Sequence, residues 1–202
     1  MFIEIIFTLH RCRVILYHQE INERMNELRL NIGCGTRHLK GYINIDKDSH
    51  CNPDIILDSS KYRLPFRDST VSRIQCRMML EHINNPMQLL DEFNRVLKTY
   101  GLVDVLVPHL SHAYSLHGGV GVHVTRFGVK SFEALTEERS YTHTRQWSHV
   151  QCRIVFPKGS LKIISYPIER LVNSNRTTQK IYELSCLQYI YPAMDLKVKM
   201  IK

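Results

Sequence analysis

Short apolar runs alternate with amphipathic segments along most of the chain. The runs expected to form strands span residues 29–33, 42–46, 53–58, 71–76 and 102–107. A helical stripe precedes the last run, formed by Leu89, Leu90, Phe93, Val96 and Leu97. The segment Asn84-Asn85-Pro86 is typical of a helix start, and we expect this helix to end at Gly101. Alternating strands and helices predict an α/β fold with a parallel, doubly wound sheet.

The two ends of the chain follow other patterns. Apolar residues at helical spacing over 12–28 predict an N-terminal helical extension over residues 1–28, ahead of one domain over 29–202. In the second half, residues 129–138 are expected to form a short helix and 147–170 to form strands. The alternation of Leu196, Val198 and Met200 predicts a closing strand.

Several polar or glycine positions fall where the predicted strands end. These ends are Gly33, Asp46, Asp58, Cys76–Arg77 and Pro108–His109. In parallel α/β sheets, ligands bind in the crevice beyond the carboxyl ends of the strands. We therefore expect these five segments to converge on one ligand site.

The pair Gly33 and Gly35, followed by Asp46, gives the strongest chemical signal. Two glycines one residue apart let the backbone turn sharply and let a ligand approach it closely. A carboxylate at the end of the next strand can accept both hydroxyls of a ribose. His38 replaces the third glycine of the dinucleotide fingerprint, and the linker Thr36–Lys40 is too short for a helix that would bind a pyrophosphate. A nucleoside cofactor without phosphates fits better; a tight turn without a ligand is the alternative.

Composition and charge exclude little. The 202 residues are 44% hydrophobic and 23% charged, as in ordinary soluble domains. The formal net charge of +8 permits contact with nucleic acid, but no run of basic residues supports such a partner. The six cysteines include no Cys-x-x-Cys pair, which favours buried thiols in a reducing cytosol. The apolar start, Phe2–Leu9, is too short to span a bilayer and lacks a secretory cleavage site, so we expect a cytoplasmic protein without a membrane span; its oligomeric state is left open.

Six segments together resemble the class I S-adenosylmethionine-dependent methyltransferases, in particular the type 11 branch. These are Leu30–Gly35, Gly41–Asp46, Pro53–Asp58, Leu64–Asp68, Leu80–Ile83 and Arg95–Lys98. The resemblance implies a Rossmann-like, mostly parallel seven-stranded sheet whose last strand runs antiparallel. It also implies S-adenosyl-L-methionine as the cofactor. The methionine part would lie over the backbone of Gly33, Cys34 and Gly35, and the ribose would lie on Asp46.

The resemblance assigns the remaining cofactor contacts less directly. The adenine amine would lie near Asp58 and Ser59. Arg77, at the end of the fourth predicted strand, could face the cofactor carboxylate; a solvated loop arginine is the alternative. Asn31 stands where many members have Asp, and Thr99-Tyr100-Gly101 replaces Pro-Gly-Gly. These departures remove none of the expected contacts, although they leave room for a member that no longer catalyses.

Four histidines follow the fifth predicted strand: His109, His112, His117 and His123. Zinc sites usually use compact histidine pairs on one rigid element with acidic or thiol partners, so this glycine-broken loop predicts no metal site. The loop resembles a substrate-side loop of some members of the branch. We therefore predict His109 and His123 as general bases, because imidazole can take a proton from an attacking hydroxyl or amine. A structural or surface role is the alternative for each.

The expected function is methyl transfer from S-adenosyl-L-methionine to O or N of a small-molecule acceptor. Alignment of the nucleophile with the methyl group would supply most of the catalysis. One alternative is a noncatalytic cofactor-binding or scaffold protein of the same fold. Another is an RNA methyltransferase, for which no aromatic-rich basic platform is evident. The fold does not choose among these functions, and the sequence does not identify the acceptor.

Overall fold

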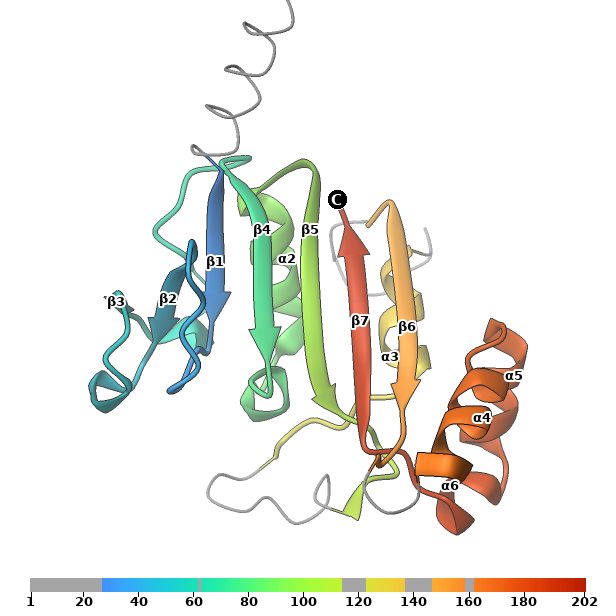
Figure 1. Ribbon diagram of the computed structural model, residues 1–202. Helices are drawn as coiled ribbons and strands as arrows, with labels where there is room; N and C mark the ends of the chain where they lie inside the picture. Colours follow the sequence, from blue (N-terminus) through green and yellow to red (C-terminus); the bar gives the residue numbers. More distant parts are fainter. Residues whose placement is uncertain (1–26, 62, 114–122, 137–146, 159–161) are drawn as a thin grey trace, which may run out of the picture.

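The computed structural model describes residues 27–61, 63–113, 123–136, 147–158 and 162–202. Its centre is a seven-stranded sheet in the order β3-β2-β1-β4-β5-β7-β6 (Figure 1). The strands are β1 (Leu28–Ile32), β2 (Ile43–Asp46), β3 (Ile55–Ile56), β4 (Val71–Arg77), β5 (Leu97–Pro108), β6 (His149–Val155) and β7 (Asp195–Ile201). The helix predicted over residues 12–28 lies almost wholly outside the described residues.

Strand β7 runs antiparallel to both of its neighbours, β5 and β6, whereas the other pairings are parallel. This confirms the predicted mostly parallel sheet with an antiparallel last strand. The carboxyl ends of β1, β2 and β4 therefore open onto one edge of the sheet, the lower edge in Figure 1.

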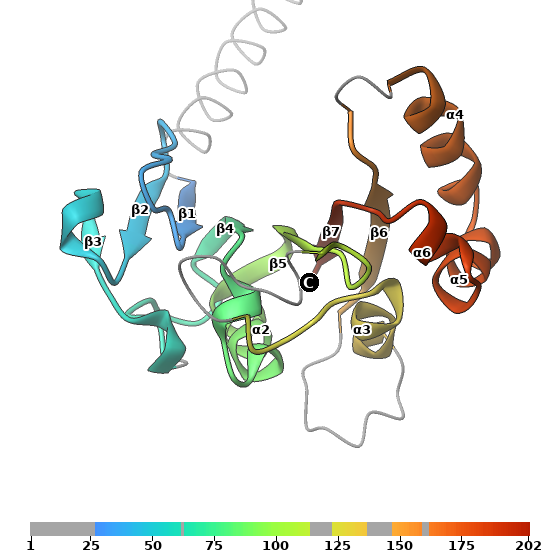
Figure 2. The ribbon, with the colours of Figure 1, turned by 90° about the horizontal axis from the view of Figure 1, so that it is seen from below.

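Side chains along β2 and β7 alternate between apolar and polar residues, as expected for strands with one face in the core. On the apolar side, Leu30, Ile74 and Val103 pack in one cluster with Phe93 of helix α2 (Pro86–Val96). Helices α2 and α3 (Val129–Glu133) cover this face of the sheet (Figure 2). Helix α4 (Lys162–Val172) lies on the other side of β6.

Helix α2 ends earlier than the sequence predicts. Asn85 caps it by accepting a hydrogen bond from the Gln88 amide, and Pro86 occupies its first turn, both as expected. However, the helix stops at Val96 rather than near Gly101. Leu97 instead has extended backbone and pairs with Val71, so β5 begins there. Strand pairing thus outweighs the helix propensity of this leucine.

The segment 147–170 was predicted to form strands, and only its first part does. Strand β6 is followed by helix α4, so the prediction was wrong for the second part. The β-branched pair Ile163-Ile164 favours strand, but both side chains are exposed. The buried residues Ser165, Glu169 and Val172 have helical spacing instead.

Short helices follow β5 and α4 as well. The segment predicted as a helix over 129–138 contains α3, followed by the 3-10 helix η5 (Ala134–Thr136). Helix α5 (Arg176–Leu184) begins at Asn175 with a capping box, and α6 (Leu187–Ile190) follows. Among the helices that the structure describes, none has the length and apolar character needed to cross a bilayer.

Candidate functional site

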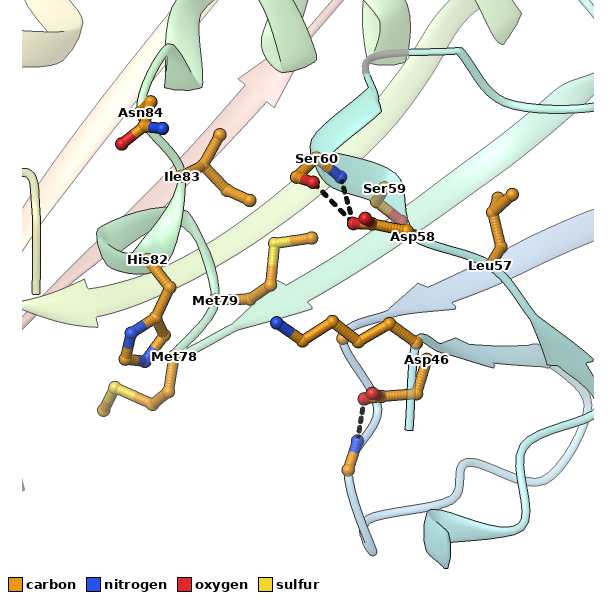
Figure 3. A pocket seen from close by; sticks show the side chains of 13 residues that line it. Asp46, Leu57, Asp58, Ser59, Ser60, Met78, Met79, His82, Ile83 and Asn84 are labelled. Carbon is orange, nitrogen blue, oxygen red and sulfur yellow. Dashed lines mark hydrogen bonds between the residues drawn. The ribbon is translucent and has the colours of Figure 1, made fainter. Parts of the chain in front are cut away.

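A cavity of about 610 Å³ lies at the carboxyl ends of β1, β2 and β4. It is lined by Gly33, Gly35, Asp46, Lys47, Leu57, Asp58, Ser59, Ser60, Met78, Met79, His82, Ile83 and Asn84. Figure 3 shows Asp46 and Asp58 on one side of it and Met78 and His82 on the opposite side. Its volume falls within the range of about 300–1,000 Å³ that is usual for small-molecule sites. The structure therefore brings together five of the predicted cofactor residues: Gly33, Gly35, Asp46, Asp58 and Ser59.

The glycine turn after β1 forms part of the cavity wall with bare backbone. Gly33 has φ +67°, and a Cβ atom there would lie 2.6 Å from Cγ of Met79. Both the backbone conformation and the close approach of Met79 therefore require glycine. The Gly33 amide donates to the Ile45 carbonyl at 2.9 Å, which fixes the turn against β2.

Two buried asparagines hold the loop between β1 and β2, which contains no helix, as its length predicted. The side-chain amide of Asn31 donates to the Arg37 carbonyl and to Oδ1 of Asn44, each at 2.9 Å. Asn44 in turn donates to Oδ2 of Asp54 from its backbone at 2.7 Å and from its side chain at 2.9 Å. An aspartate at position 31 could not donate to a carbonyl, so this departure from the family pattern has a structural reason.

Asp46 joins the turn to the cavity. Its Oδ2 accepts a hydrogen bond from the Gly35 amide at 2.7 Å, and its Oδ1 accepts one from the Asp48 amide at 3.0 Å. Each carboxylate oxygen can accept more than one hydrogen bond, so both retain acceptor capacity toward the cavity. Asp46 thus holds the glycine turn and also lines the cavity with a carboxylate.

Asp58 and Ser59 lie at the start of the 3-10 helix η2 (Ser59–Lys61), directly after β3. The hydroxyl and the backbone amide of Ser60 both donate to Oδ1 of Asp58. These two hydrogen bonds, the hydroxyl first, hold the pKa of Asp58 below its usual value. Asp58 is therefore an ionised acceptor at neutral pH, and Oδ2 accepts no hydrogen bond from the described residues.

Two other predicted cofactor residues do not line the cavity. The side chain of Cys34 is buried, and burial is the first cause that raises the pKa of its thiol. Arg77 is half-buried near Asp195, whose pKa burial raises above its usual value, a rise that the Arg77 charge opposes only in part. Its Nε has no hydrogen-bond partner among the described residues. Cys34 is therefore connected with the site only by its backbone, which lies between Gly33 and Gly35.

The predicted catalytic histidines lie in two different environments. His109 is fully buried, with Nδ1 2.8 Å from the Ser111 hydroxyl and Nε2 3.0 Å from Oε1 of Glu183. It does not line the cavity. His123 is half-buried, and its ring centroid lies 4.9 Å from that of His82, which does line the cavity. His112 belongs to the described loop, whereas His117 lies outside the described residues.

The wall that follows β4 was not predicted as part of the site. It includes Met78, Met79 and the 3-10 helix η3 (Leu80–His82). Met78 has φ +50°, so the backbone turns sharply at the end of β4 and brings the next residues over the cavity. The position of Leu80–Ile83 just after a strand was a usable signal, but the motif had served only to establish the resemblance. Lys47, next to Asp46, was also missed.

The chain and the structure are similar to known methyltransferases. Residues 40–104 match the family model of a methyltransferase domain. This match covers β2 to the middle of β5 and includes Asp46, Asp58 and His82. No curated protein matches the sequence.

Solved structures extend the similarity to the whole fold. A SAM-dependent methyltransferase from Archaeoglobus fulgidus superposes with a TM-score of 0.61 at 14% identity, over 96% of this chain and 94% of that one. Phosphoethanolamine N-methyltransferase 2 from Haemonchus contortus, in complex with S-adenosyl-L-methionine, superposes with a TM-score of 0.55 at 14% identity. That match covers 88% of this chain and 49% of the Haemonchus enzyme. The comparisons confirm the predicted resemblance to class I methyltransferases of the type 11 kind.

Proposed function

We propose that this protein is an S-adenosyl-L-methionine-dependent methyltransferase that transfers the methyl group to an oxygen or nitrogen atom of a small-molecule acceptor. One observation carries the proposal. Gly33 and Gly35, Asp46 and Asp58 come from three separate strand ends and line the same cavity, which the methyltransferase-domain match partly covers. In α/β sheets this is the place where a cofactor binds.

The residues of the cavity fit this cofactor. S-adenosyl-L-methionine has no phosphate, and the described connection between β1 and β2 provides no helix N-terminus for one. Asp46 and Asp58 both line the cavity, where Asp46 would accept the ribose hydroxyls and Asp58 would accept a hydrogen bond from the adenine amine. Both are carboxylates, so the positive sulfonium meets a favourable electrostatic environment.

Catalysis in this arrangement depends mainly on positioning. The bound cofactor supplies an activated methyl group. The glycine turn and Asp46 would fix one reactant, while the wall formed by Met78, His82 and Asn84 faces the acceptor side. Alignment of two bound reactants is worth about 7–11 kcal/mol of barrier in well-oriented systems.

The imidazole groups of His82 and His123 are the nearest candidates to receive the acceptor proton. His82 lines the cavity, and His123 lies beside it. His109, also predicted as a base, has a neighbour at hydrogen-bond distance from each ring nitrogen and is fully buried. We therefore assign His109 to the support of the loop after β5.

Isothermal titration calorimetry with S-adenosylhomocysteine, S-adenosyl-L-methionine and NAD tests the cofactor. We expect the first two ligands to bind in the calorimeter. In thermal denaturation the same two ligands should raise the melting temperature by mass action, and NAD should do neither. Tighter binding of NAD would overturn the proposal. A radiolabelled methyl-transfer screen over small hydroxylated compounds, amines and total RNA then tests the acceptor class. Cofactor binding without transfer to any of them would favour the noncatalytic alternative.

A further inference from the structure

Three potential metal ligands converge beside the cavity. Glu81, His82 and His123 each offer one ligand atom, and these atoms all lie within 4.8 Å of one another. Glu81 and His82 belong to η3, directly after β4, whereas His123 comes from the chain that follows β5. The two imidazole rings are 4.9 Å apart between centroids and inclined at 68°. Two histidines and one carboxylate, drawn from two segments, therefore face a common point.

Backbone hydrogen bonds hold the two segments together. The Glu81 carbonyl accepts from the amides of Val124 at 2.8 Å and Thr125 at 3.2 Å. The Thr125 hydroxyl donates to the Ile83 carbonyl at 3.1 Å. These contacts join Glu81 and Ile83, the neighbours of His82, to the two residues that follow His123. The cluster is thus built on a fixed scaffold rather than on separate loops that meet by chance.

The carboxyl group of Glu81 has an unmet need for a partner. The residue is 2% exposed, and within the part of the chain that the structure describes its Oε2 atom has no hydrogen-bond partner. Asp195 is a second carboxyl group near enough to interact electrostatically with Glu81. A buried carboxylate oxygen without a partner carries a cost in free energy, and a cation would satisfy it.

We propose that Glu81, His82 and His123 bind one divalent transition-metal cation, of the class of zinc, cobalt or manganese. Sites with two histidines and one carboxylate leave coordination positions open in catalytic zinc centres and in other first-row metal sites. Metal–ligand distances of about 2.0–2.2 Å place tetrahedral ligands about 3.4 Å apart. The three ligand atoms, which lie within 4.8 Å of one another, would have to move closer together to reach that spacing.

His82 is part of both the cluster and the cavity wall, so an open coordination position lies next to the cavity. This step rests on the proposed function: the cation would hold an oxygen atom of the acceptor. With their imidazoles bound to the metal, His82 and His123 would no longer act as bases; the metal ion would instead lower the pKa of the bound hydroxyl group and so promote loss of its proton to solvent. The oxygen then forms a bond to the methyl carbon, the carbon–sulfur bond breaks, and sulfur keeps the electron pair. The cluster therefore favours a hydroxyl-bearing acceptor that can chelate a metal.

Direct metal titration tests the site without any acceptor. Metal-free protein is titrated with Co²⁺, followed by its visible absorption, and with Zn²⁺ in the calorimeter. We expect one ion per chain with nitrogen and oxygen ligation. Glu81→Gln, His82→Ala and His123→Ala should each weaken binding at least about tenfold. His149→Ala is the matched control, because His149 is an exposed histidine at the opposite end of the sheet and should leave the affinity unchanged.

Variant folding and cofactor binding are measured on the same samples. If Glu81→Gln fails to fold, the exposed His82 provides the decisive variant. Equal affinity in wild type, His82→Ala and His123→Ala would overturn the metal site, as would an equal loss in His149→Ala. Binding of S-adenosylhomocysteine without metal binding would reject the metal site and leave the proposed function intact. Metal binding without cofactor binding would do the reverse.

Discussion

Two polar regions of this protein differ in how completely their hydrogen-bonding groups are satisfied. The first surrounds Arg95 of α2, whose side chain is 8% exposed. Its guanidinium donates to Glu92 and Asp68 and to the carbonyls of Leu64 and Phe66. The second is the cavity, where the carboxylates of Asp46 and Asp58 retain acceptor capacity. The difference indicates that the Arg95 cluster stabilises the fold, whereas the cavity is arranged to receive a ligand.

The largest expected effect is on the Arg95 cluster. Arg95→Met should lower the free energy of unfolding by about 3–5 kcal/mol, because it leaves the buried Glu92 carboxylate without its charged partner. Urea denaturation measures the change. The affinity for S-adenosylhomocysteine should stay near that of the wild type under conditions in which the variant is folded. Arg67→Met is the matched control, since Arg67 is an exposed arginine on the loop that carries Phe66 and Asp68. A loss below about 1 kcal/mol would mean that the cluster does not stabilise the fold.

The second prediction concerns the cavity, whose carboxylates retain hydrogen-bond acceptor capacity. Asp46→Ala should weaken S-adenosylhomocysteine binding by about 1.5–3 kcal/mol, or roughly 10- to 100-fold, because the ribose loses hydrogen bonds to a charged acceptor. The protein should remain folded by circular dichroism. Asp48→Ala removes an exposed carboxylate two residues away that does not line the cavity. A change of less than about threefold for Asp46→Ala, or an equal change in the control, would remove Asp46 from the binding site.

Sequence patterns were sufficient for the sheet and for one side of the cavity. Gly33, Asp46 and Asp58 each follow a strand whose apolar run is evident, and parallel strands place such residues at one edge. The opposite wall depends on the sharp turn at Met78, where φ is +50° at a residue that gives no local signal for it. The Glu81–His82–His123 cluster likewise requires knowledge of which loop packs on η3.

The supporting role that we propose for His109 could not be predicted from the sequence. Its partner Glu183 lies 74 positions further along the chain, on a helix that the pattern did not predict. A histidine after a strand of an α/β sheet is compatible with catalysis or with support, and only the burial and partners separate the two. Glu183 also accepts from the Val129 amide at 2.7 Å, so it links three elements.

The third prediction is that His109, like Arg95, has its hydrogen-bonding groups satisfied by buried partners and stabilises the fold. His109→Ala should lower the free energy of unfolding by about 1–3 kcal/mol, because Glu183 loses one of its buried partners. Affinity for S-adenosylhomocysteine should not change, since His109 does not line the cavity. Thermal denaturation and calorimetry measure the two quantities. Wild-type stability combined with a lost methyl-transfer rate would instead return His109 to the catalytic role predicted from the sequence.

The smallest expected effect concerns Asp54, which has features of both regions. Asp54 supports the wall of the cavity, and its carboxylate oxygen already accepts hydrogen bonds from Asn44. The hydrogen bonds from the Asn44 backbone and side chain hold the pKa of Asp54 below its usual value. A carboxylate with a lowered folded-state pKa contributes stability that is present at neutral pH and is lost as the pH falls below about 4. The difference in unfolding free energy between wild type and Asp54→Asn should therefore be constant near neutrality and shrink in acid. Since Asn44 also fixes the glycine turn through Asn31, cofactor affinity should follow the same trend. Urea denaturation of both proteins across the acid range decides the matter: a difference that stays constant down to about pH 3 would show that the Asp54 charge does not support the turn.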